Sequence, residues 1–137
     1  MSESLTFAKS HYYDTRKAGI TLPVILQSGS NTIGLEAKLD TGSSYCVFKR
    51  AQGEFLGLDI ESGIPQLMRT VTGDFLTCGH EVTLSVLGIE TVTRVYFAAD
   101  ENFTRNVLGR QGWLDRVRLG LVDYEGKLYL SAYDDVV

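Results

Sequence analysis

The stretch Leu39-Asp40-Thr41-Gly42-Ser43-Ser44 places an acidic residue directly after an apolar strand and directly before a run of small residues. A carboxylate at the end of a hydrophobic strand is costly unless hydrogen bonds or a charged partner satisfy it. Gly42 has no Cβ, so the backbone there can bring an N–H close to the Asp40 carboxylate. The hydroxyls of Thr41 and Ser43 offer further hydrogen bonds that would lock the turn. We therefore interpret the segment as a loop that holds one carboxylate, Asp40, in a fixed position.

Alternation of apolar and polar residues around this loop predicts a mainly β fold. Residues 32–39 alternate with a period of two, which is typical of a strand with one buried face. Residues 20–27 are a second strand candidate, joined to the first by the turn-forming cluster Ser28-Gly29-Ser30-Asn31. We expect further strands at 45–48, 67–72, 75–87, 91–98, 106–109, 118–122 and 127–132, and short helices at 49–57 and 111–117. Many short strands with one or two short helices predict a small barrel, either closed or sandwich-like.

The composition fits one domain with its own core. The chain has 137 residues, of which 44% are hydrophobic and 22% are charged, so we expect a single domain. Its formal charge of -4 argues against nucleic acid as a general partner. The longest apolar runs are far too short to cross a bilayer, so we expect no membrane partner. The first residues contain no apolar run of signal-peptide length, which favours a cytoplasmic location with Cys46 and Cys78 reduced.

Most other patterns that carry chemistry are absent from the sequence. It contains no G-x-S-x-G nucleophile elbow, no Walker loop and no Rossmann fingerprint. His11 and His80 have no metal-ligand spacing, and Cys78-Gly79-His80 offers fewer than the roughly four ligands of a zinc site. We therefore expect neither a metal nor a cofactor. Cys46 and Trp113 are interpreted as core residues.

A single carboxylate is a poor catalyst for the hydrolysis of a peptide bond. Without a metal, that reaction needs a base to activate water and an acid to protonate the carbonyl oxygen. Two carboxylates that share one proton supply both, because like charges about 3 Å apart cannot both ionise. The sequence holds no second Asp-Thr-Gly or Asp-Ser-Gly, so a catalytic Asp40 would need its equivalent from a second chain across a two-fold axis. The alternative is an ordinary turn after a strand, where Asp-x-Gly is common.

The chain resembles the retropepsin-type aspartic proteases, a family that includes the retroviral proteases and short bacterial relatives. The segment 39–44 matches the catalytic loop of the family. The second match is Val107-Leu108-Gly109-Arg110, two apolar residues followed by Gly and Arg, which in the family crosses behind the catalytic loop and leads into a short helix. Between the two matches lies a hairpin in the place of the family's flap, with Thr72, Gly73, Asp74 and Phe75 at its tip. The resemblance covers residues 21–130, nearly the whole chain.

This resemblance implies a homodimeric aspartic endopeptidase that acts on a peptide or protein substrate. Each chain would supply Asp40 as the catalytic residue, with Thr41, Gly42 and Ser43 as support. It implies one retropepsin-like domain over residues 1–137, a barrel of the acid-protease type, with 1–19 as an N-terminal extension and 133–137 as a tail. Two alternatives remain open: a retropepsin-like module that binds peptide or protein without cutting it, and a generic small barrel with an accidental Asp-Thr-Gly turn.

The sequence departs from the family pattern in three places. Retroviral enzymes usually carry an acidic residue at the position of Ser44, where it pairs with the Arg of the second signature. Arg110 must therefore find a backbone carbonyl or Asp115, or remain at the surface. The hairpin tip is not Gly-rich, which favours either a stiffer flap or a flap that recognises something other than an extended apolar peptide. No segment clearly matches the terminal strands that join viral dimers, although residues 127–132 are a candidate.

Overall fold

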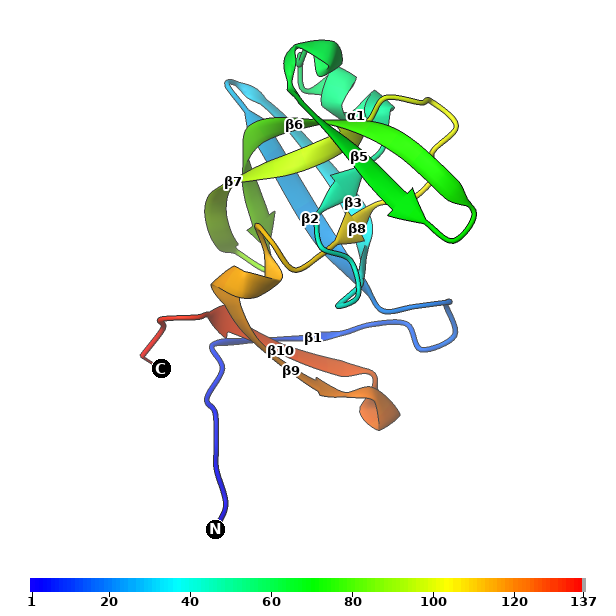
Figure 1. Ribbon diagram of the computed structural model, residues 1–137. Helices are drawn as coiled ribbons and strands as arrows, with labels where there is room; N and C mark the ends of the chain where they lie inside the picture. Colours follow the sequence, from blue (N-terminus) through cyan, green and yellow to red (C-terminus); the bar gives the residue numbers. More distant parts are fainter. Residues whose placement is uncertain (137) are drawn as a thin grey trace.

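The computed structural model describes residues 1–136 and folds them into two sheets (Figure 1). The mainly β class predicted from the sequence is confirmed. A three-stranded sheet has the order β1-β10-β9, and a seven-stranded sheet has the order β2-β3-β8-β4-β7-β6-β5. The elements are β1 (Lys9–Tyr12), β2 (Thr21–Ser28), β3 (Asn31–Leu39), β4 (Val47–Phe48), α1 (Arg50–Phe55), η1 (Ile60–Ser62), β5 (Ile64–Thr70), β6 (Gly73–Val86), β7 (Ile89–Ala98), β8 (Val107–Leu108), η2 (Leu114–Arg116), β9 (Val117–Val122), η3 (Asp123–Glu125) and β10 (Lys127–Ala132).

The larger sheet returns on itself because β2 pairs with β6 as well as with β3. The strands β2, β3, β8, β4, β7 and β6 therefore form a ring, and β5 pairs with β6 outside it. The hairpin of β5 and β6 extends from the ring, and its turn projects away from the other strands (Figure 1). One edge of β5 is free, because β5 stands at the end of the strand order in the described sheet and pairs with β6 alone.

Alternating burial along the strands fills the ring with apolar side chains. In β2, Leu22, Val24 and Leu26 are at most 1% exposed, whereas the residues between them face outward. Burying a side chain of this size contributes roughly 1.5–3 kcal/mol relative to leaving it in water. Cys46 and Trp113 belong to the same core, as the sequence predicted.

Two local predictions differ from the structure. The helix expected at 111–117 shrinks to the 3₁₀ turn η2, because Gly112 adopts a left-handed φ of 97° that interrupts a helix. The strand β1 lies inside the segment expected to be an N-terminal extension, and it pairs with β10 from Lys9 opposite Leu130 to Tyr12 opposite Lys127. The helix expected at 49–57 is present as α1.

The three-stranded sheet brings the two ends of the chain together below the ring (Figure 1). Its central strand is β10, so both edges of residues 127–132 are occupied within the chain. In this sheet the free edges belong to β1 and β9, and a dimer-forming role for residues 127–132 stays a prediction. The phenol of Tyr13 donates a 2.5 Å hydrogen bond to Asp123 Oδ1, which ties the end of β1 to the turn before β10.

Within residues 1–136, no helix has the length and apolar character needed to cross a membrane.

The Tyr13 hydrogen bond makes a prediction for stability against pH. The bond to Asp123 raises the pKa of the Tyr13 phenol to about 12. The neutral phenol is the donor, so its contribution is complete below the unfolded pKa of about 10 and is lost as the pH rises through about 12. Tyr13→Phe should lower the midpoint of denaturant unfolding at neutral pH. The difference in midpoint between the variant and wild type should shrink as the pH rises from about 10 to about 12.

Tyr124→Phe is the matched control, because Tyr124 is fully exposed in the neighbouring turn. An equal loss of stability in both variants would contradict a specific role for the Tyr13 bond.

Candidate functional site

Backbone groups hold the Asp40 carboxylate at the surface of the ring. The N–H of Gly42 donates to Asp40 Oδ1 at 2.9 Å, and the N–H of Ser43 donates to the Asp40 carbonyl at 3.1 Å. The N–H of Asp40 in turn donates to the Leu108 carbonyl at 3.0 Å. Asp40 and Gly42 are exposed, so the carboxylate is presented to solvent in a defined position.

The Ser43 hydroxyl locks the turn as predicted, whereas the Thr41 hydroxyl does not. Ser43 Oγ donates to the Tyr45 carbonyl at 2.8 Å, which closes the loop but does not reach the carboxylate. The Thr41 hydroxyl makes no hydrogen bond within residues 1–136, and Thr41 is exposed. Gly42, rather than the hydroxyls, therefore supports the carboxylate.

The second predicted signature lies directly beside this loop. Strand β8 runs parallel to the end of β3, with Leu108 opposite Leu39, and antiparallel to β4. The N–H groups of Arg110 and Gln111 donate at 2.9 Å to the carbonyls of Ser43 and Ser44. The structure thus brings together the two sequence matches, and the segment after β8 anchors the loop through its backbone.

Gly109 makes this contact possible. A Cβ at position 109 would lie 2.1 Å from the Tyr45 carbonyl oxygen and 2.8 Å from the Ser43 carbonyl oxygen, far inside van der Waals contact. The N–H of Gly109 donates to Cys46 Sγ at 3.4 Å. Burial raises the pKa of the Cys46 thiol to about 11, so the sulfur stays neutral and serves as a packed acceptor.

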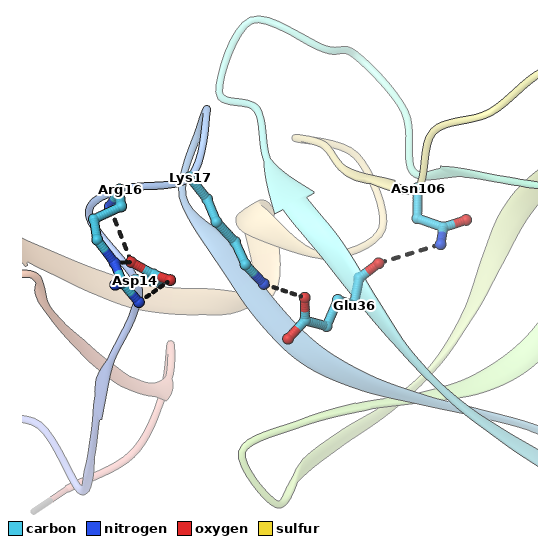
Figure 2. Close-up of polar contacts among 5 residues, drawn as sticks. All are labelled: Asp14, Arg16, Lys17, Glu36 and Asn106. Carbon is cyan, nitrogen blue, oxygen red and sulfur yellow. Dashed lines mark hydrogen bonds and ion pairs between the residues drawn. The ribbon is translucent and has the colours of Figure 1, made fainter.

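Asn106 supports β8 from the other side and was not singled out by the sequence. Its Nδ2 donates to the Glu36 carbonyl of β3 at 3.2 Å, and Figure 2 shows its side chain directed at that strand. Its Oδ1 accepts from the N–H of Lys49 at 3.2 Å, next to β4. The sequence could have pointed to this residue, because Asn106 stands directly before the apolar-Gly-Arg signature.

The same region of β3 carries exposed ion pairs. Lys17 Nζ lies 3.2 Å from Glu36 Oε2, and Asp14 pairs with Arg16 in the loop between β1 and β2 (Figure 2). Exposed pairs of this kind contribute little to stability. Hydrogen bonding to Arg16 nevertheless holds the pKa of Asp14 below its usual value.

A groove of about 690 Å³ opens between the Asp40 loop and the β5–β6 hairpin. Of the predicted flap residues, Phe75 lines it, whereas Thr72, Gly73 and Asp74 do not. The register pairs Thr70 with Gly73, so the turn is Val71-Thr72, and Gly73 and Asp74 are exposed residues at the start of β6. The lining residues are Asp40, Gly42, Ser43, Ser44, Tyr45, Val47, Gln66, Leu67, Met68, Arg69, Thr70, Val71, Phe75, Phe103, Arg105 and Val107.

Phe103 links the hairpin to the segment before β8. Its ring stacks on Phe75 with centroids 4.8 Å apart and planes 24° apart. The sequence analysis singled out neither Phe103 nor Arg105 as a groove residue. Their contribution depends on how the hairpin folds back over the ring, which a local pattern does not encode.

Arg110 remains at the surface, one of the three outcomes expected for it. It is exposed and forms no ion pair within residues 1–136. Asp115 instead accepts a hydrogen bond from the N–H of Gly112 at 3.1 Å.

His80 makes a 2.9 Å contact with the Ile60 carbonyl, away from the groove. In the described part of the chain, no three His, Cys, Asp or Glu side chains gather to hold a metal ion.

Comparisons with known proteins support the fold. No protein-family model matches the chain, and no curated protein matches it. Among solved structures, the chain is similar to the EIAV protease in complex with the inhibitor HBY-793, with a TM-score of 0.54 and 25% sequence identity. The match covers 69% of this chain and 84% of that protease. The chain therefore has a retropepsin-like fold.

The Gly109 contact predicts a large effect from one methyl group. Gly109→Ala forces Tyr45 or β8 to move, so we expect a loss of roughly 1–3 kcal/mol in the free energy of unfolding, the usual cost of overpacking. Gly34→Ala is the control, because a Cβ at position 34 meets nothing within 4 Å. Denaturant unfolding measures both variants, and equal stabilities would contradict the prediction.

Proposed function

We propose that the chain is an aspartic endopeptidase that works as a homodimer, with Asp40 of each chain as the catalytic residue. The observation that carries the proposal is the position of Asp40. Its carboxylate is exposed, is held by the Gly42 N–H, and lines a groove whose opposite wall is the β5–β6 hairpin. The similarity of the fold to a retroviral protease supports the same reaction class.

The groove of one chain offers too few carboxylates for the reaction, which supports the need for a second chain. Asp40 is the one carboxylate among the groove-lining residues within 1–136. Hydrolysis by acid and base together requires two, and a two-fold axis beside Asp40 would supply the second. The exposed Asp40 and Thr41 suit such a contact, because neither side chain is covered by its own chain.

In the proposed mechanism the two Asp40 carboxyl groups share one proton, and one acts as the base while the other acts as the acid. The ionised Asp40 takes a proton from a water molecule, whose oxygen attacks the carbonyl carbon of the scissile bond. The protonated Asp40 of the other chain gives its proton to the carbonyl oxygen, so the tetrahedral intermediate is neutral there. The Asp40 that took the proton from water then gives it to the departing amine nitrogen. The other Asp40 takes a proton from a hydroxyl of the intermediate, so that the carbonyl re-forms as a carboxylic acid and the C–N bond breaks. The pair then shares one proton again.

The hairpin supplies the means to bind an extended peptide. Strand β5 is paired with β6 on one side, and its residues from Gln66 to Thr70 line the groove. A peptide that adds to the free edge of β5 would gain main-chain hydrogen bonds regardless of its sequence. Binding of this kind also suits the alternative function, a module that holds a peptide without cutting it.

Asp40→Asn should abolish cleavage while leaving the fold intact. The amide accepts no proton from water, so we expect kcat/KM for a susceptible peptide to fall by about 10²–10⁴-fold or more. Asp134→Asn is the control, because Asp134 is exposed in the C-terminal segment and does not line the groove. Full cleavage by Asp40→Asn would remove Asp40 from the reaction.

Dimerisation is tested separately by concentration. Specific activity should rise with protein concentration in parallel with the dimer fraction measured by sedimentation, because half a site does no chemistry. A chain that cleaves as a monomer would contradict the two-chain site. A chain that stays monomeric and binds peptide without cleavage would favour the binding module.

A further inference from the structure

We propose that Arg69 and Arg105 form a basic subsite that selects substrates with an acidic side chain, Asp or Glu, close to the scissile bond. This inference rests on the proposed function, since it assigns the substrate class of the same groove. Arg69 and Arg105 are the two cationic residues among the groove-lining set of the described chain, and Asp40 is the one carboxylate in that set.

The two arginines reach the groove from different elements. Arg69 lies near the end of β5 in the hairpin, and Arg105 lies in the segment before β8, two residues after Phe103. Because Phe103 stacks on Phe75, the segment that carries Arg105 is held against the hairpin that carries Arg69. An acidic side chain lying along the groove would therefore meet a cation on either wall.

Both guanidinium groups are free within residues 1–136. Each is exposed, and neither forms an ion pair or a hydrogen bond there. Asp74 is the cross-strand partner of Arg69, yet it makes no ion pair with it and does not line the groove. Arg50 shows the contrast, because Glu61 binds it with two 2.6 Å hydrogen bonds.

The two arginines offset the negative charge of the proposed catalytic pair. A pair of Asp40 carboxylates that shares one proton keeps a net negative charge and repels an acidic substrate. Two arginines from each chain outweigh that charge in the assembled groove. Guanidinium also binds a carboxylate through two parallel N–H donors, which gives geometric selection as well as attraction.

The test compares matched peptides. A randomised peptide library identifies a cleaved sequence by mass spectrometry, and that peptide is then synthesised with Glu, Gln or Lys at each position around the cut. We expect a Glu peptide to have a kcat/KM about tenfold above its Gln counterpart at one or more positions, with the ratio falling as salt is added. Lys at the same position should be cleaved least.

Arginine variants assign the preference. Arg69→Gln and Arg105→Gln should each reduce the Glu-to-Gln ratio, because kcat/KM falls more for the Glu peptide than for the Gln peptide, and Arg105→Glu should shift the preference toward Lys. Arg94→Gln is the control, because Arg94 is exposed on β7 and does not line the groove. Equal ratios in wild type and in both groove variants would overturn the subsite.

A binding measurement separates this inference from the proposed function. Fluorescence anisotropy with Asp40→Asn protein, and peptides selected from the same library by affinity, reports the Glu preference without any cleavage. Preference in binding without cleavage by wild type would uphold the basic subsite and refute the protease. Cleavage with no preference for Glu would do the reverse.

Discussion

The approach of Gly109 to the Asp40 loop is the constraint on which the proposed site depends. No side chain fits between Gly109 and the Tyr45 carbonyl, so the end of β8 and the loop are in direct backbone contact. The next two N–H groups then pair with loop carbonyls. The position of the carboxylate is thus fixed by a segment far along the chain, and the loop hydroxyls add little to it.

The groove combines two structurally different walls. The floor belongs to a ring of paired strands whose interior is filled by apolar side chains, so it resists deformation. The other wall is a hairpin with one free strand edge and an exposed turn. The stack of Phe75 on Phe103 joins this hairpin to the segment that leads into β8. A peptide in the groove would therefore contact a fixed carboxylate on one side and a strand with a free edge on the other.

Local sequence patterns predicted the features that depend on neighbouring residues, namely strand alternation and the two motifs. Alternation along 32–39 gave the β2–β3 hairpin and the fold class, and the two motifs marked the segments that meet at Asp40. Strand β1 was missed because Lys9–Tyr12 has no alternating apolar face, and its strand conformation comes from pairing with β10. Arg69 and Arg105 were missed because their place in one groove depends on the register of a hairpin and the course of a loop, which are tertiary properties.

The pairing of Lys9 with Leu130 has a consequence for how the chain is made. During synthesis the first strand leaves the ribosome long before its partner exists, and the Asp40 loop likewise waits for β8. Folding with so many distant pairings is slow, because each long loop must close before its contacts form. The nascent chain therefore carries an unsupported acidic loop until β8 has been made, and an unpaired β1 until β10 has been made.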